Sequence, residues 1–198
     1  MSKFQYQYDS LKNSYLWGMK IKRHTDVNRL KAIVLYVLNM VPRKFLGKHE
    51  LFKILYFASQ KRLVRYGSAM ISDFYAFQYG PVPSELFDLI NTHNSAIMLS
   101  IDIDETGYIL SPKEGFDAAE LSAADIECLD ESIKENHGLL FQILTDKSHD
   151  SAWKKAWENP KGKRGAKIDI IDIAIAAGAD EKTIEYIQED LEIEAVLR

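Results

Sequence analysis

Histidine and cysteine are the residues of this chain best suited to acid–base, metal-binding or nucleophilic chemistry. The histidines lie in different predicted elements, and none has the spacing of metal ligands on one helix, such as His-x3-His. They are His24, His49, His93, His137 and His149. Only a three-dimensional convergence of His149 with Asp146 and Asp150 would build a catalytic site. Since the chain also has no phosphate loop and no dinucleotide fingerprint, we expect no enzymatic activity, no metal and no cofactor.

The single cysteine, Cys128, is predicted to lie within an amphipathic helix beside Glu127 and Asp130. These acidic neighbours oppose formation of the thiolate, so Cys128 is not expected to be a nucleophile. One cysteine excludes an intrachain disulfide framework and fits a reducing compartment. We see no secretory signal and no run of about 18 uncharged apolar residues, and we therefore expect a cytoplasmic protein without a transmembrane helix.

Basic residues are concentrated in the first third of the chain. Residues 1–66 contain 14 Lys and Arg against 3 Asp and Glu, whereas residues 67–198 contain 11 against 26. Either the two parts neutralise each other within the fold, or the first part presents a basic surface to nucleic acid or to an acidic partner. Charge alone does not separate these interpretations.

Helical spacing of apolar residues predicts a helix over 25–41 and a second over 48–66, which Gly67 ends. The second helix is apolar over so much of its circumference that we expect it at the centre of the core. Its remaining face carries Lys53, Lys61, Arg62 and Arg65.

An aromatic run from Phe74 to Tyr79 predicts a strand, and the Gly-Pro-Val-Pro segment after it predicts a turn into a helix that extends to about Asn94. Residues 97–110 consist of two apolar segments with Asp-Glu-Thr-Gly between them, and this pattern predicts a β-hairpin. Further helices are expected to begin at Ser122, with Asp125 in a capping box, and at Ser148.

After Pro160 the composition changes to a basic linker, an apolar segment over 168–177 and an acidic helix from Asp180. We therefore predict an α+β fold that is predominantly helical, with one small antiparallel sheet. The predicted division of the chain is an N-terminal arm (1–23), the domain (24–160) and a helical C-terminal extension (161–198).

Several of these segments, in the same order and spacing, resemble the Panacea family, the SocA-like antitoxin domain. The resemblance covers about residues 25–160. Its motifs are Lys53-Ile54-Leu55-Tyr56-Phe57-Ala58, Tyr66-Gly67, Ala76-Phe77-Gln78-Tyr79-Gly80-Pro81-Val82, Leu121-Ser122, Leu144-Thr145, Ser148-His149 and Trp153. The resemblance implies an antitoxin of a bacterial or phage-associated toxin–antitoxin system. Such a protein neutralises a cognate toxin, expected to be encoded by an adjacent gene, by direct binding and without catalysis.

The candidate contact surface combines the basic face of the second helix with the turn that follows the aromatic strand. Gly80 permits close backbone approach and the prolines make the turn rigid. The alternatives are that the turn is a structural corner and that His149 and Trp153 belong to the core. The candidate partner-binding residues are Lys61, Arg62, Arg65, Tyr75, Tyr79, Gly80, Pro81, Val82, Pro83, His149 and Trp153.

Two other functions remain open at this point. The basic first third could serve a nucleic-acid-binding regulator, although the second helix is too apolar to lie exposed in a groove of DNA. The acidic tail after Asp180 could serve a proteolytic or phage-interaction adaptor. The toxin, the stoichiometry and the oligomeric state are not predicted.

Overall fold

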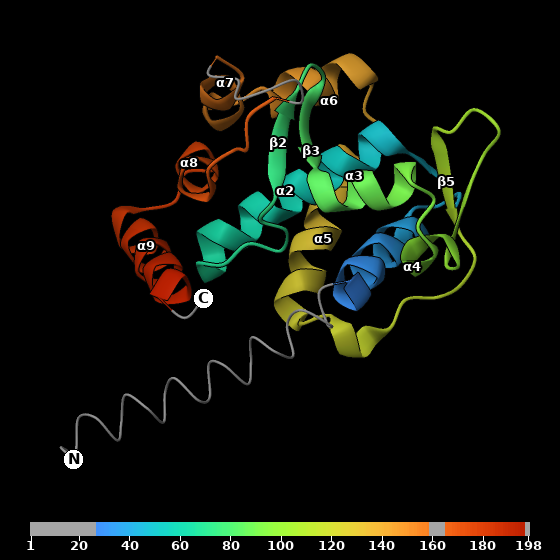
Figure 1. Ribbon diagram of the computed structural model, residues 1–198, viewed down its shortest axis with the longest axis horizontal. Coiled ribbons are helices and arrows are strands. Elements are labelled where there is room, and N and C mark those ends of the chain that lie inside the picture. Colours follow the sequence, from blue (N-terminus) through green and yellow to red (C-terminus); the bar gives the residue numbers. More distant parts are fainter. Residues whose placement is uncertain (1–26, 159–164, 197–198) are drawn as a thin grey trace.

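Helix α2 (Lys48–Tyr66) is the central element of this computed structural model, which describes residues 27–158 and 165–196 (Figure 1). Residues 51–59 are all buried, Lys53 and Ser59 included, so the helix is enclosed by the fold around most of its circumference. The helix ends at Gly67, whose positive φ of 64° closes it in the left-handed conformation. The prediction of a central second helix is confirmed.

A first helix, over residues 27–40, is joined to α5 (Ala123–Asn136), which itself packs along α2. The hydroxyl of Tyr36 donates a 2.6 Å hydrogen bond to Asp130 on α5. Residues 25 and 26, the predicted start of the first helix, lie outside the described residues. The first helix, α5 and α2 therefore pack together as one group of helices.

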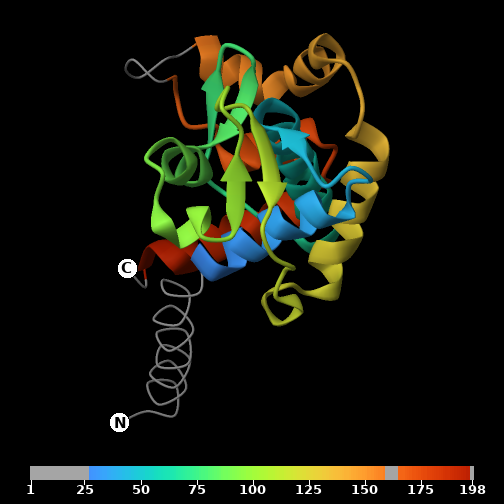
Figure 2. The same cartoon turned by 90° about the vertical axis from the view of Figure 1, so that its right-hand side faces the viewer.

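The strands form two antiparallel sheets (Figure 2). One contains β1 (Leu46–Gly47), β5 (Ile109–Pro112) and β4 (Ile101–Ile103) in that order. The other pairs β2 (Phe74–Phe77) with β3 (Gly80–Pro83). The predicted aromatic strand and the predicted hairpin are both present, but they belong to different sheets. The fold class, α+β and predominantly helical, is confirmed.

The Gly-Pro-Val-Pro segment is a strand, not the turn that the sequence predicted. Pro81 and Pro83 lie opposite Ala76 and Phe74. The N–H of Ala76 and the C=O of Phe74 point away from β3 and bond to residues 166–168, at 2.9 and 2.8 Å. Because these positions exchange no hydrogen bond with β3, the missing N–H of each proline breaks no bond of the ladder.

The helix predicted to extend to Asn94 is shorter. It forms α3 (Ser84–Asn91), and a single turn, α4 (Ser95–Met98), follows. The side chain of Asn94 accepts a hydrogen bond from the N–H of Ala96 and so acts as the N-cap of α4. Residues 97 and 98, predicted as the start of the hairpin, therefore belong to a helix, and the strand begins at Ile101.

Ser122 and Ser148 were both predicted to cap the start of a helix, and the structure gives different results for the two. The capping box of Ser122 and Asp125 at the start of α5 is confirmed. The prediction that Ser148 caps the next helix is wrong, because Asp150 accepts the N–H of Trp153 there. The Ser148 hydroxyl instead donates to a carbonyl within its own helix.

Helices α6 (Phe141–Ser148), α7 (Ser151–Glu158), α8 (Ile170–Ala176) and α9 (Glu181–Val196) complete the structure. A short 3-10 helix, η1 (Ala118–Glu120), precedes α5. In the described part of the predicted extension, α8 packs against α7 and α2, and α9 packs against α8 and α2 (Figure 1). The extension contributes side chains to the common core: Ile168, Ile173, Ala174 and Ile187.

Within the ranges that the structure describes, no helix combines the length and the hydropathy that crossing a membrane requires.

Candidate partner-binding surface

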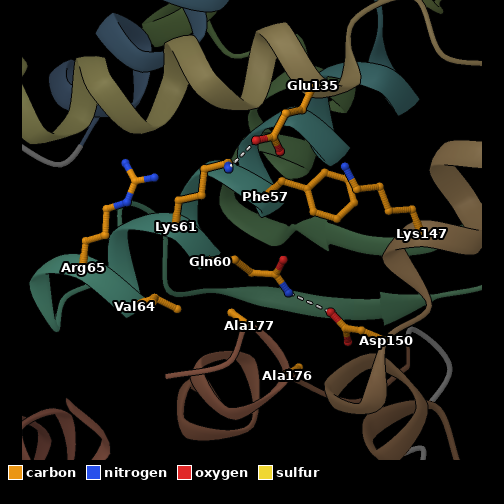
Figure 3. A pocket seen from close by; sticks show the side chains of 10 residues that line it. All are labelled: Phe57, Gln60, Lys61, Val64, Arg65, Glu135, Lys147, Asp150, Ala176 and Ala177. Carbon is orange, nitrogen blue, oxygen red and sulfur yellow. Dashed lines mark hydrogen bonds and ion pairs between the residues drawn. The ribbon is translucent and has the colours of Figure 1, made fainter. Parts of the chain in front are cut away.

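The basic face of α2 is directed at the acidic face of α5. The ammonium of Lys61 lies 2.7 Å from Glu135 and 3.2 Å from Glu131 (Figure 3 shows the pair with Glu135). The guanidinium of Arg65 lies 2.6 Å from Glu131 and 2.8 Å from Glu127. The hydrogen bond from Arg65 lowers the pKa of Glu131 to about 2. These two cations of the basic first third are thus neutralised by carboxylates of the acidic remainder.

Arg62, the third cation of this face, reaches a buried carboxylate. Its Nε lies 2.8 Å from Asp125. The same carboxylate accepts hydrogen bonds from both terminal nitrogens of Arg29, at 2.8 and 2.9 Å. Burial opposes ionisation of Asp125, but hydrogen bonds from Arg29 and Ser122 outweigh it and lower the pKa of Asp125 to about 2. This arrangement ties the first helix, α2 and α5 together.

The motif residues of α2 and of the β2–β3 hairpin meet at Lys53. Its side chain is only 1% exposed, and its ammonium donates a 2.9 Å hydrogen bond to the carbonyl oxygen of Pro81. Burial lowers the pKa of Lys53 to about 7. Gly80 has a φ of 100°, and a Cβ there would overlap Ser148 and Lys53. Glycine is therefore required where the hairpin meets α2 and α6.

His149 and Trp153 support the same hairpin. Their rings stack with centroids 3.6 Å apart and an interplanar angle of 6°. The indole nitrogen of Trp153 donates to the carbonyl oxygen of Phe77, 3.0 Å away. Burial and the nearby Lys53 lower the pKa of His149. Trp153 is buried, so this pair holds β2 in position from the side of the core.

The two carboxylates considered from the sequence for a catalytic convergence with His149 both accept hydrogen bonds from other side chains. Asp150 accepts hydrogen bonds from Tyr56 and Gln60, at 2.8 and 2.7 Å, and Asp146 accepts one from Gln142. Among the residues that the structure places, no group of three His, Cys, Asp or Glu side chains could hold a metal ion.

A polar cavity of about 350 Å³ lies beside Asp150, between α2, α6 and α8 (Figure 3). Gln60 bridges to Asp150 on one wall, and the Lys147 ammonium lies 4.7 Å from the ring centroid of Phe57 on another. Each charged group among its lining residues contacts another described residue of the chain.

A larger concavity is an apolar groove of about 860 Å³, which we call the aromatic groove. It runs between the start of α2, the β2–β3 hairpin, α3, the β4–β5 loop and the start of α6. Several rings at its edge are exposed: 54% for Tyr79, 67% for Tyr108 and 49% for Phe141. Its lining residues are Gly47, Lys48, His49, Phe52, Lys53, Phe77, Gln78, Tyr79, Val82, Phe87, Ile90, Asn91, His93, Ile103, Thr106, Gly107, Tyr108 and Phe141.

Ring contacts give the groove a fixed shape. Tyr79 meets Phe141 edge-on with centroids 5.3 Å apart, and Phe77 lies 5.6 Å from Phe87. His49 stacks on Phe141 at 4.0 Å. Burial, together with repulsion from Lys53, lowers the pKa of His49 to about 4, so its imidazole is neutral near pH 7.

The candidate residues predicted from the sequence thus separate into several groups. Tyr79 and Val82 line the aromatic groove, and Tyr75 is half-buried on the strand. The other residues of the turn, Gly80, Pro81 and Pro83, are buried. The sequence did not single out the other groove residues, such as Phe87, Tyr108 and Phe141.

Together these features define a mainly helical α+β domain whose open concave surface is apolar and aromatic. Residues 51–154, from the first buried turn of α2 to Trp153 and its neighbour, match the family model described as "Antitoxin SocA-like, Panacea domain", and the chain belongs to this family. The resemblance stated from the motifs is confirmed. No curated protein and no solved structure matches the chain.

Proposed function

We propose that this protein is an antitoxin that neutralises a cognate protein toxin by direct binding, without chemistry of its own. Its membership of the SocA-like antitoxin family supports this function. The observation that carries the proposal is the aromatic groove, which lies largely within the matched residues and exposes rings that the fold leaves uncovered. Tyrosine and phenylalanine of this kind supply much of the energy of protein interfaces.

In this proposal the toxin contacts the groove through Tyr79 and its surroundings. The β2–β3 hairpin that carries Tyr79 is held by Lys53 and Trp153, so little conformational entropy remains to be lost on binding. The other candidates, Lys61, Arg62 and Arg65, act within the fold, where they hold α5 against α2.

The alternative of a nucleic-acid-binding regulator has less support. It requires exposed cations on the first two helices, and three of those on α2, Lys61, Arg62 and Arg65, are paired with α5. A polyanion gains affinity only from cations that it can reach. The adaptor function of the tail stays a prediction, which truncation after Pro160 would test.

The decisive experiment expresses the neighbouring gene in a host, alone and together with this chain. We expect toxicity that co-expression relieves, and a stoichiometric complex on co-purification. Tyr79→Asp and Phe141→Asp are expected to abolish both, whereas Leu99→Asp, which changes an exposed residue outside the groove, preserves them. A harmless neighbouring product, or toxicity that this chain does not relieve, would refute the proposal.

A further inference from the structure

The charged side chains that line the aromatic groove are all basic. The groove is lined by Lys48 and Lys53, and none of its lining residues is Asp or Glu. Lys48 lies at the rim, with its ammonium 3.4 Å from the side-chain oxygen of Asn91 and 5.5 Å from the ring centroid of Tyr108. Throughout the part of the chain that the structure describes, neither lysine forms an ion pair.

Lys48 differs in this respect from the cations that join the first helix and α2 to α5. Arg29, Arg62 and Arg65 pair with acids at 2.6–2.9 Å, and so does Lys61. A lysine beside exposed rings therefore retains its capacity to bind an anionic group brought by another molecule.

We propose that the aromatic groove binds a peptide segment of the partner in which a large apolar side chain stands next to a carboxylate. The apolar side chain enters between Phe77, Phe87 and Phe141, and the carboxylate pairs with the ammonium of Lys48. This inference rests on the proposed antitoxin function, because it describes the segment of the toxin that the groove recognises. Charge complementarity selects the occupant, since an apolar segment with a basic residue would place two cations together.

The surroundings of the groove favour one carboxylate over a polyanion. The β4–β5 loop carries Asp104 and Glu105 immediately before the groove residue Thr106. Hydrogen bonds from the N–H of Ile109 and from Thr106 lower the pKa of Asp104, which therefore stays ionised. A nucleic acid in the groove would place successive phosphates near these carboxylates.

The test uses the full chain and a matched set of fluorescein-labelled Gly/Ser peptides that carry Phe-Asp, Phe-Lys, Ala-Asp or Ala-Lys at the centre. Binding is measured by fluorescence anisotropy. We expect the Phe-Asp peptide to bind most tightly, by roughly three- to tenfold over Phe-Lys, as for an ion pair at a partly desolvated surface. The preference should weaken as salt is added.

Lys48→Glu is expected to reverse the order of Phe-Asp and Phe-Lys. Lys134→Glu is the matched control, because Lys134 is an exposed lysine of α5 outside the groove, and it should leave the order unchanged. Equal binding of all peptides, no binding of Phe-Asp, or tighter binding of a single-stranded oligonucleotide would each overturn the inference.

The same variants separate this inference from the proposed function. If the chain neutralises the neighbouring product and Lys48→Glu neutralises it equally well, the groove chemistry is wrong while the antitoxin function stands. If the neighbouring product is harmless but the peptide order reverses in Lys48→Glu, the antitoxin function is wrong while the peptide preference stands.

Discussion

The ammonium of Lys53 donates its 2.9 Å hydrogen bond to the carbonyl oxygen of Pro81 from a fully buried position on α2. The carbonyl of Pro81 is available as an acceptor, because Pro81 lies opposite Ala76 in a pair that exchanges no hydrogen bond across the ladder. The contact connects the central helix to the strand beside Tyr79. It therefore couples the stability of the core to the shape of the aromatic groove.

The buried Lys53 predicts a characteristic dependence of stability on pH. Its pKa is about 7 in the folded chain and 10.5 in the unfolded chain, so between these values the unfolded state binds more protons. The contribution of Lys53 to the free energy of unfolding consequently rises with pH, by up to about 1.4 kcal/mol per unit, and is constant below pH 7. Urea unfolding of the wild type and of Lys53→Met at pH 7, 8 and 9 measures it. Parallel pH profiles of the two proteins would contradict the prediction.

Gly80→Ala is expected to destabilise the fold by roughly 2 kcal/mol or more, because alanine is strained at φ 100° and its Cβ overlaps Ser148. Gly115→Ala is the matched control, since a Cβ there meets nothing within 4 Å. Thermal or urea unfolding compares the two. An equal effect at both positions would show that the hairpin is not held as described.

Asp125→Asn is expected to cost about 3–5 kcal/mol, because it removes the buried carboxylate that is the counter-charge of Arg29 and Arg62. Glu127 pairs with Arg65 at the surface, so Glu127→Gln is expected to lower the free energy of unfolding much less, by no more than about 1 kcal/mol. The folded pKa of Asp125 is lowered, so the stabilisation is complete above the unfolded pKa of 3.8 and is lost as the pH falls towards 2. Denaturant unfolding at neutral and acid pH checks both the size and the sign.

Reversal of the basic face of α2, by changing Lys61, Arg62 and Arg65 together to Glu, is expected to lower the melting temperature, because each change opposes a carboxylate of α5. The matched control changes three exposed lysines, Lys134, Lys154 and Lys182, to Glu. Differential scanning calorimetry measures the difference. An unchanged melting temperature in the first variant would return these residues to the candidate contact surface.

Local patterns in the sequence predicted the elements that local physics determines. The apolar spacing of α2, the end of that helix at Gly67 and the capping box at Ser122 depend on residues within a few positions of each other. The strand β3 was missed, because two prolines in a short segment argue against a strand. They are tolerated here because the backbone groups opposite them on β2 bond to residues 166–168, which the local sequence does not reveal.

The candidate site was harder to predict because it is assembled from distant segments. Phe87, Tyr108 and Phe141 come from a helix, a hairpin loop and a helix start, and nothing in their local spacing relates them. The same holds for the charges. The asymmetry between the two parts of the chain was evident, but the face on which Lys61 and Arg65 would find partners depended on the packing of α5 against α2.

Residues 166–168, which bond to β2, have a further consequence for how a partner can be bound. They occupy the outer edge of β2, and the outer edge of β3 offers no N–H at Pro81 or Pro83. Neither side of this small sheet can accept an additional strand, so β-augmentation by a bound polypeptide is excluded here. Recognition at the hairpin must therefore depend on side chains, which makes its specificity adjustable by substitutions that leave the backbone unchanged.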